Sequence, residues 1–291
     1  MIKSFYKLLF SLLIIGSCKK EISLVSTDFT TENEFTAGIE GPAVDNNGNL
    51  YAVNYKEEGT IGIVDKKGNA SLFVTLPNGS IGNGIRFDQN NNMFIADYVS
   101  HNILMIKNGE KKVQIFASDS TLNQPNDLAI SPNGTLYASD PNWANETGKL
   151  WMVKNNTFIL LEADMGTTNG IEVAPDGKTL YANESVQRRI WKYSISKNGR
   201  LKNKTLFTSF TNFGLDGMRC DSKGNLYVCR YGKGTVAIFN PNGTLLREIQ
   251  LKGKKPTNIS FGGGENKQCF VTVADRGIIE TFFAEYPGRS F

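Results

Sequence analysis

Short segments in which apolar and polar residues alternate recur along most of the chain, separated by turns rich in Asn, Asp and Gly. The stretch from Met165 to Glu184 shows the pattern clearly, because a strand that begins at Asn169 is followed by the turn Asp176-Gly177 and by a second apolar strand. Such alternation is typical of half-buried β-strands, and Asp-Gly tolerates the positive φ that a tight hairpin needs. The pattern therefore predicts consecutive antiparallel hairpins.

The hairpin unit occurs six times, and an aromatic residue marks each copy. The markers are separated by 43 to 46 residues and are Tyr51, Phe94, Tyr137, Tyr181, Tyr227 and Phe270. Repetition at this period in a strand-rich chain is typical of propeller blades, which bury their faces only against their neighbours. We expect an all-β fold, a six-bladed β-propeller. The sixth unit ends one strand short, and the segment from Leu24 to Thr31 is expected to close the ring as an N-terminal strand in the last blade.

The start of the chain has the features of an export signal. Two lysines precede an apolar run over residues 8–15, which is too short for a membrane-spanning helix. Small residues precede Cys18, as in a bacterial lipobox, where the cysteine is lipidated and becomes the mature N-terminus; a plain secretory signal is the alternative. We expect a signal peptide over 1–17, a lipidated Cys18 with a tether over 18–26, and a single propeller domain over 27–291. Lipid alone would anchor the protein in the bacterial cell envelope, in the periplasm or at the outer membrane.

Composition excludes several kinds of chemistry. The formal net charge of +4 falls to +2 without the two leader lysines, and no basic stripe suggests a nucleic-acid partner. Cys220, Cys229 and Cys269 cannot all pair with one another, so buried apolar cysteines are favoured over a disulfide, which export would permit. His101 is the one histidine, and the sequence has no CxxC or GxSxG motif, which argues against a zinc site and a serine triad.

Aligning the six units on their aromatic markers brings an oxygen-bearing side chain to the same position in each. Eleven or twelve residues before the marker stand Glu40, Asn83, Asn126, Asn169, Asp216 and Asn258. This position begins the innermost strand, which lines the central channel of a propeller, so we expect a ring of oxygen ligands. Asn and Asp also favour loop-to-strand junctions, but that preference does not explain Glu40. Two carboxylates among amide oxygens suit Ca²⁺ or another hard divalent cation.

Five short motifs occur in order at blade spacing, namely Glu40-Gly41-Pro42, Pro125-Asn126-Asp127, Asn169-Gly170, Asp216-Gly217-Met218 and Pro256-Thr257-Asn258. Over about residues 36 to 287 they resemble the gluconolactonase, regucalcin (senescence marker protein) and luciferin-regenerating enzyme family. The resemblance implies a six-bladed propeller that hydrolyses sugar lactones and binds Ca²⁺ through the residues matching Glu40, Asn126, Asn169 and Asp216. It also implies that the metal polarises the carbonyl and that Asp216 is the base or nucleophile.

The family resemblance does not predict which lactone is the substrate. Gln124 stands where animal members of the family have an arginine that contacts sugar hydroxyls. Substrate contacts are expected from a second ring, three residues after each marker, which reads Asn54, Asp97, Asp140, Glu184, Arg230 and Val273. Trp143 lies close behind this ring in sequence, and polar groups beside aromatic faces suit a sugar-like ligand. The predicted substrate site therefore consists of Asn83, Gln124, Asp140, Trp143, Glu184, Arg230 and Asn258.

The sequence thus predicts a calcium-dependent hydrolase of sugar lactones or related esters, a monomer that acts on a small molecule. Two alternatives stay open. One is a non-catalytic propeller that binds a glycan or a protein, since propellers serve as binding platforms. The other is a phosphotriester hydrolase with the same metal. Glu40 and Asp216 favour an enzyme, because a binding propeller has no need of two carboxylates that converge on a channel of amides.

Overall fold

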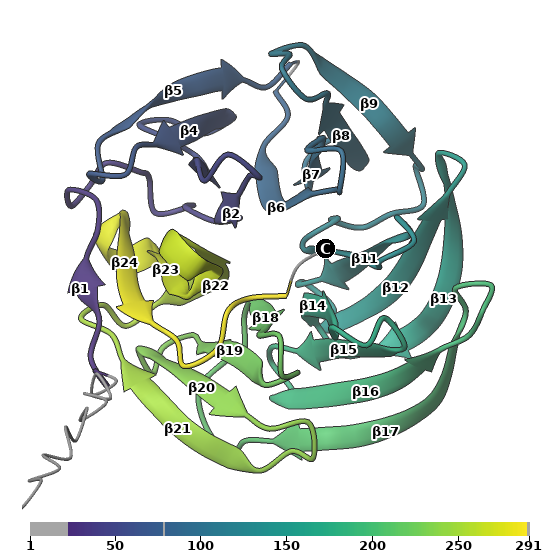
Figure 1. The fold of residues 1–291 in the computed structure, drawn as a ribbon. Coiled ribbons are helices and arrows are strands. Elements are labelled where there is room, and N and C mark those ends of the chain that lie inside the picture. The colour runs from purple at the N-terminus through teal and green to yellow at the C-terminus, as the bar shows by residue number, and fades with distance from the viewer. Residues whose placement is uncertain (1–22, 78, 290–291) are drawn as a thin grey trace, which may run out of the picture.

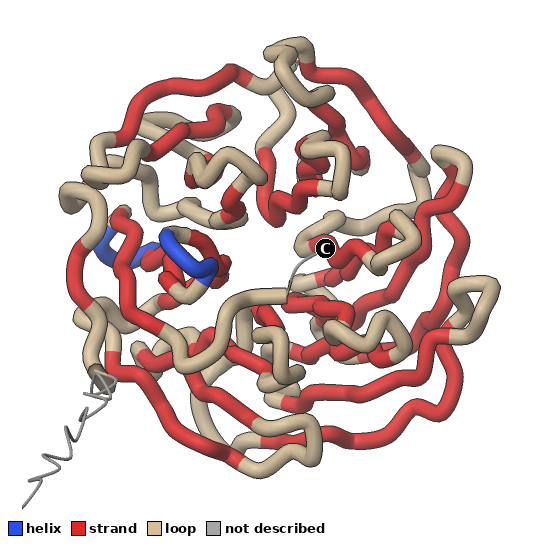
Figure 2. The backbone as a smooth tube through the Cα atoms, in the orientation of Figure 1, coloured by secondary structure: helices blue, strands red, loops and turns tan. Residues whose placement is uncertain are grey.

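Six four-stranded sheets surround a central opening in the computed structural model, which describes residues 23–77 and 79–289 (Figure 1). Strands make up most of the described chain, and two short 3₁₀ turns, η1 (Gly264–Asn266) and η2 (Ala274–Arg276), lie in the last blade (Figure 2). Neighbouring strands in each sheet run antiparallel. The predicted six-bladed β-propeller is confirmed.

The first five blades take their strands in chain order from the channel outward. The first three blades are β2 (Ala43–Val44), β3 (Leu50–Val53), β4 (Thr60–Val64) and β5 (Ala70–Thr75); β6 (Gly82–Phe87), β7 (Met93–Asp97), β8 (Asn102–Ile106) and β9 (Val113–Ser118); and β10 (Leu128–Ile130), β11 (Leu136–Asn142), β12 (Thr147–Lys154) and β13 (Thr157–Met165). The next two are β14 (Thr168–Val173), β15 (Thr179–Glu184), β16 (Arg189–Ile195) and β17 (Leu201–Ser209); and β18 (Met218–Cys220), β19 (Leu226–Arg230), β20 (Thr235–Phe239) and β21 (Leu245–Gln250). The last blade is β22 (Pro256–Gly262), β23 (Gln268–Val273) and β24 (Ile278–Phe283), with β1 (Thr27–Asp28) outermost.

The ring closes through the N-terminal strand, as the sequence predicts. β1 pairs with β24, with Thr27 opposite Thr281 and Asp28 opposite Glu280 (Figure 1). Ion pairs reinforce this contact, because Arg276 Nη1 lies 2.7 Å from Asp28 Oδ1 and 2.9 Å from Glu280 Oε1. The first and last segments of the propeller domain are therefore held together by both backbone and side chains.

Removal of the closing strand is expected to destabilise the whole propeller. A chain that starts at residue 32 loses the pairing of β1 with β24 and the contact between Phe29 and Phe270, whose ring centroids are 4.8 Å apart. Because each lost hydrogen bond contributes about 1 kcal/mol, we expect the unfolding temperature to fall by roughly 10 °C relative to a chain that starts at residue 23. Thermal unfolding followed by circular dichroism measures the difference. Equal unfolding temperatures for the two chains would contradict this role of β1.

The aromatic markers owe their regular spacing to the contacts between blades. All six are buried, with exposed fractions of 6% or less. Tyr51 packs against Phe87 of the next blade at 5.4 Å between ring centroids, and Tyr227 packs against Phe261 of the next blade at 5.0 Å. Each hydrophobic cluster combines residues of two neighbouring blades, so the core is a series of interfaces around the ring.

The remaining cysteines pack as small apolar side chains. Cys220, Cys229 and Cys269 are buried and free, as the sequence favours, and Cys229 and Cys269 share one hydrophobic cluster. Cys18 and the leader lie outside the described residues, so the signal peptide and the lipid anchor stay predictions. In the part of the chain that the structure describes, no helix is long and apolar enough to cross a membrane.

Candidate active site

The six ring positions come together because neighbouring inner strands approach closely where they begin. A Cβ atom on Gly217 would lie 2.0 Å from the side chain of Asn258, and one on Gly170 would lie 2.3 Å from the carbonyl oxygen of Asp216. Hydrogen bonds cross the same gaps, since the Gly217 amide donates to the Thr257 carbonyl at 2.7 Å. The Asn-Gly and Asp-Gly pairs of the motifs therefore let adjacent blades meet at the channel.

The two ring carboxyls, Glu40 and Asp216, lie close enough to interact electrostatically. Glu40 is buried and accepts a hydrogen bond from Asn258 Nδ2 at 3.0 Å. Burial raises the pKa of Glu40 to about 7, and the charge of Asp127 contributes. Burial also raises the pKa of Asp216 well above its ordinary value, the charge of Glu40 adds to the rise, and a hydrogen bond from Asn169 opposes it. Two carboxylates that disfavour each other's ionisation are a site that a cation would stabilise.

Several amide oxygens beside these carboxyls have no partner. The side-chain oxygens of Asn126, Asn169 and Asn183 are buried and accept no hydrogen bond within the described residues. Each unsatisfied oxygen costs about 1–3 kcal/mol, so a partner is to be expected. Together with the two carboxyls they form a set of hard oxygen donors, which fits Ca²⁺ or a similar divalent cation. Among the described residues no three His, Cys, Asp or Glu side chains could hold a metal alone, so amide oxygens would have to complete the coordination.

Asn83 and Asn258, the two ring residues that are not predicted metal ligands, form hydrogen bonds with neighbouring blades. Asn83 is half-buried, and its Nδ2 atom donates to the Asn126 carbonyl at 3.1 Å. Asn258 is 1% exposed, donates to Glu40, and accepts a hydrogen bond from Arg219 Nη1 at 3.2 Å. Asn258 therefore positions Glu40 instead of offering its amide to a substrate, which differs from the sequence-based prediction. Asn83 keeps enough exposure for its substrate contact to stay a prediction.

The second ring also differs from its prediction. All six of its side chains are at most 4% exposed, so a substrate cannot touch them in this conformation. Asp140 accepts hydrogen bonds from the backbone amides of Asn123 at 2.8 Å and Gln124 at 2.7 Å, and from Trp151 Nε1 at 2.9 Å. Glu184 similarly accepts from the Gly166 amide at 2.9 Å. Both acids therefore bind the backbone of the loop that leads into the inner strand of their own blade.

Arg230 is likewise a loop-holding residue. It is 1% exposed, its guanidinium lies 3.5 Å from the centre of the Phe210 ring, and its Nη2 atom donates to the Asn212 carbonyl at 2.7 Å. The expectation of a substrate-facing cation at this position is therefore not met.

Gln124 and Trp143 are the predicted substrate residues that line an open cavity. This cavity, of about 480 Å³, lies on the rim where the inner strands begin, and His101 and Asn142 also line it. Trp143 is 44% exposed, and Gln124 is half-buried. An exposed indole beside amide groups can receive a hydroxylated ring, so their substrate contacts stay a prediction with a suitable cavity.

A set of buried charged residues near the ring was not predicted from the sequence. Asp127, which is 1% exposed, lies 3.0 Å from Arg86 and 3.9 Å from Arg219, and Glu172 pairs with Arg289. Arg86, Glu172 and Arg219 each stand three residues after a ring position, a spacing that the sequence displays. Side chains of a regular strand alternate between its two faces, so the second residue after a ring position would share its side of the strand and the third would not. Register shifts within β6, between Gly82 and Ile85, and within β14, between Thr168 and Ile171, change this phase.

Fold and site together define a β-propeller with a candidate cation site in its channel. The chain belongs to the SMP-30/Gluconolactonase/LRE-like region family, whose model matches residues 38–275. The family resemblance inferred from the sequence motifs is confirmed.

Relatives in this family carry more than one named activity. The chain is 26% identical to a diisopropyl-fluorophosphatase of Loligo vulgaris, over 92% of this chain and 96% of that protein. It is 25% identical to a gluconolactonase of Zymomonas mobilis, over 66% of this chain and 60% of that protein. Among solved structures, the calcium-binding protein regucalcin of Agrobacterium tumefaciens superposes with a TM-score of 0.79 at 20% identity, over 94% of this chain and 98% of that one. This last similarity supports the fold.

Proposed function

We propose that the chain is a metal-dependent hydrolase of sugar lactones or related lactones, with Ca²⁺ held by Glu40, Asn126, Asn169 and Asp216. The observation that carries the proposal is the occurrence, at one end of the channel, of a buried and a half-buried carboxyl of raised pKa together with amide oxygens that accept no hydrogen bond in the described structure. The family, and a relative named gluconolactonase, support the reaction class.

The chain's own residues supply positioning and proton transfer. The bound cation would polarise the lactone carbonyl and stabilise the negative charge that develops on its oxygen. Asp216 is partly exposed, and in its ionised form the carboxylate would accept a proton from an attacking water. Asn169 orients Asp216 by a hydrogen bond, and Asn258 fixes Glu40 in the same way. The reacting groups are thus held in place before a substrate arrives.

A substrate panel tests the reaction class. The soluble chain over residues 23–291 is assayed with gluconolactone, other sugar lactones, aliphatic lactones and a nitrophenyl phosphotriester, each corrected for spontaneous hydrolysis in buffer. We expect sugar lactones to give the highest kcat/KM, because Gln124 and Trp143 offer amide and indole contacts to a hydroxylated ring. If the protein binds the metal but hydrolyses none of these compounds above the spontaneous rate, the enzyme proposal fails and a binding propeller takes its place.

Phosphotriester hydrolysis is the second candidate. One observation favours it, namely that a relative aligned over nearly the whole of both chains is named diisopropyl-fluorophosphatase. The same cation and carboxylate would serve a phosphoryl centre as well as an acyl centre. Turnover of the phosphotriester with no turnover of lactones would therefore replace the first proposal by the second.

A further inference from the structure

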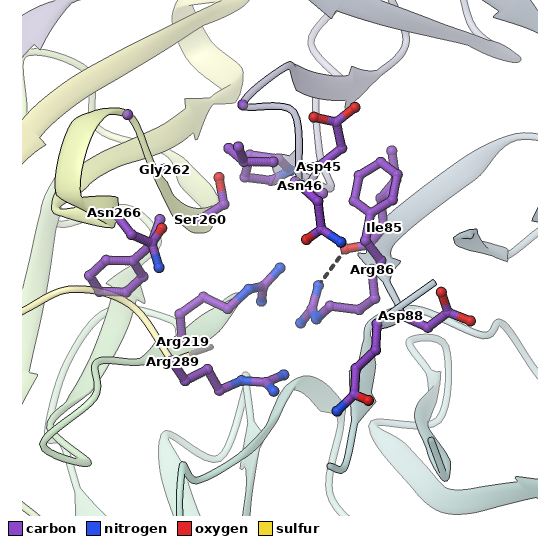
Figure 3. Close-up of a pocket in the computed structure, with 18 of the residues that line it drawn as sticks. Asp45, Asn46, Ile85, Arg86, Asp88, Arg219, Ser260, Gly262, Asn266 and Arg289 are labelled. Carbon is purple, nitrogen blue, oxygen red and sulfur yellow. Dashed lines mark hydrogen bonds between the residues drawn. The ribbon is translucent and has the colours of Figure 1, made fainter. Parts of the chain in front are cut away.

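A second cavity lies at the end of the channel away from Glu40. It has a volume of about 570 Å³ and forms where β2, β6 and β22 end in their turns. Three arginines line it, Arg86 from β6, Arg219 from β18 and Arg289 from the C-terminal segment. Figure 3 shows their guanidinium groups extending toward the same region of the cavity from different sides. This end of the channel is therefore as rich in cationic groups as the other end is in carboxyls.

Two of these arginines share one buried carboxylate. Asp127 lies 3.0 Å from Arg86 Nη2 and 3.9 Å from Arg219 Nη1, so within the described residues both guanidinium groups have the same ion-pair partner. A negative group in the cavity would give this pair of guanidinium groups a second counter-charge.

The acids that line the cavity, Asp45 and Asp88, are engaged in their own turns. Asp45 accepts hydrogen bonds from the amides of Asn47 at 2.9 Å and Asn49 at 2.8 Å. Asp88 makes the equivalent bonds within the next turn, with the Asn90 amide at 2.9 Å. In Figure 3 both carboxylates point away from the arginines. They fix the hairpins and do not pair with the guanidinium groups in the described structure.

Donor atoms in the cavity also lack partners. Arg86 Nε, Arg219 Nη2 and Ser260 Oγ are buried and make no hydrogen bond within the described residues, and all three residues are at most 7% exposed. Burial lowers the pKa of Arg219 to about 9, and repulsion from Arg86 contributes. Buried donors without acceptors are uncommon in native proteins, and here they lie on residues that line one cavity.

We propose that this cavity binds a small oxyanion, a carboxylate or a phosphate group, held by Arg86, Arg219 and Ser260. Guanidinium groups suit this ligand because their N–H bonds match the two oxygens of a carboxylate or a phosphate. The cavity leaves room for a larger molecule that carries the anionic group. The site lies beyond the proposed hydrolytic centre and does not depend on that activity.

Calorimetric titration of the soluble chain tests the site. Inorganic phosphate and acetate are titrated separately at constant ionic strength, with a chelator present so that no metal phosphate forms. We expect one site for at least one of the two anions, and the anion that binds more tightly identifies the chemistry. Arg219→Gln should weaken binding about tenfold or more, since a hydrogen bond to a charged group contributes about 1.5–3 kcal/mol.

The Ser260→Asp variant separates loss of the anion site from loss of the fold. It places a carboxylate beside the arginines, so we expect a folded protein, with an unchanged or higher unfolding temperature, that no longer binds the anion. Arg247→Gln is the matched control and should bind as the wild type does, because Arg247 pairs with Glu285 at the surface.

Three results would overturn the proposal. The first is no binding of either anion at concentrations of about 10 mM, where even a weak site would be partly filled. The second is unchanged binding in Arg219→Gln and Ser260→Asp, which would place the anion elsewhere. The third is binding only in a chain shortened to end at Arg289, which would show that residues 290–291 occupy the cavity of the full chain.

Discussion

Replacing Asp216 by Asn is expected to lower kcat/KM for the best lactone about a thousandfold, because it removes both a metal ligand and the proton acceptor. The substitution keeps the size of the side chain. It also removes the repulsion between Asp216 and Glu40, so the metal-free variant should unfold at a temperature no lower than that of the wild type near pH 8. Steady-state kinetics and thermal unfolding of the same preparation therefore separate lost chemistry from lost structure.

Asp164→Asn is the control for this substitution. Asp164 is an exposed acid at a positive φ of 56° on the outer strand β13, a conformation that Asn also tolerates. We expect wild-type kinetics for this variant. Full activity in a folded Asp216→Asn variant would remove Asp216 from the mechanism, whatever the role of the metal.

Calcium is expected to stabilise the protein far more at pH 8 than at pH 5. The pKa of Glu40 in the folded chain, about 7, lies above its ordinary value of 4.5, so the fold favours the protonated carboxyl. The stability that this protonation contributes is complete below about pH 4.5 and is lost as the pH rises through 7. The loss is about 3 kcal/mol for Glu40, and Asp216, whose pKa is also raised, shifts in the same direction. A divalent cation binds the ionised carboxylates and reverses the loss.

Unfolding temperatures measured from pH 5 to pH 8, with and without Ca²⁺, test this linkage. The metal-free protein should become less stable across this range, and the gain from Ca²⁺ should grow. Glu40→Gln should remove much of the pH dependence, because the amide cannot ionise. A gain from Ca²⁺ that is as large at pH 5 as at pH 8 would show that the ion binds somewhere other than at these carboxyls.

The repeat made the fold predictable from the sequence alone. Each blade must place a large aromatic side chain against its neighbour, so the period of the markers reports the architecture directly, and the missing sixth-blade strand identifies its N-terminal donor. The ring of Glu40, Asp216 and the four asparagines was predictable for the same reason, since it occupies one position of the repeat.

The second ring and the buried charged residues were harder to predict from the sequence. A polar residue near the end of a strand can face a substrate or bind the backbone of the loop that leads into its blade, and Asp140 and Arg230 do the latter. Register shifts in two inner strands turned Arg86 and Glu172 toward the channel, against the simple alternation of a strand. Arg289 lies outside the repeats and forms a hydrogen bond with Glu172, 117 positions earlier in the chain. The sequence alone gives no sign of this contact.

The most direct test of the central claim is the hydrolysis of gluconolactone before and after removal of metal. The chain over residues 23–291 is treated with a chelator, freed of it, and assayed again after addition of Ca²⁺, with Glu40→Gln treated in parallel. The account predicts that chelation reduces the rate to the spontaneous rate, that Ca²⁺ restores it, and that Glu40→Gln recovers little of it. Hydrolysis that survives chelation, or that returns equally in Glu40→Gln, would contradict a catalytic metal held by the ring of channel oxygens.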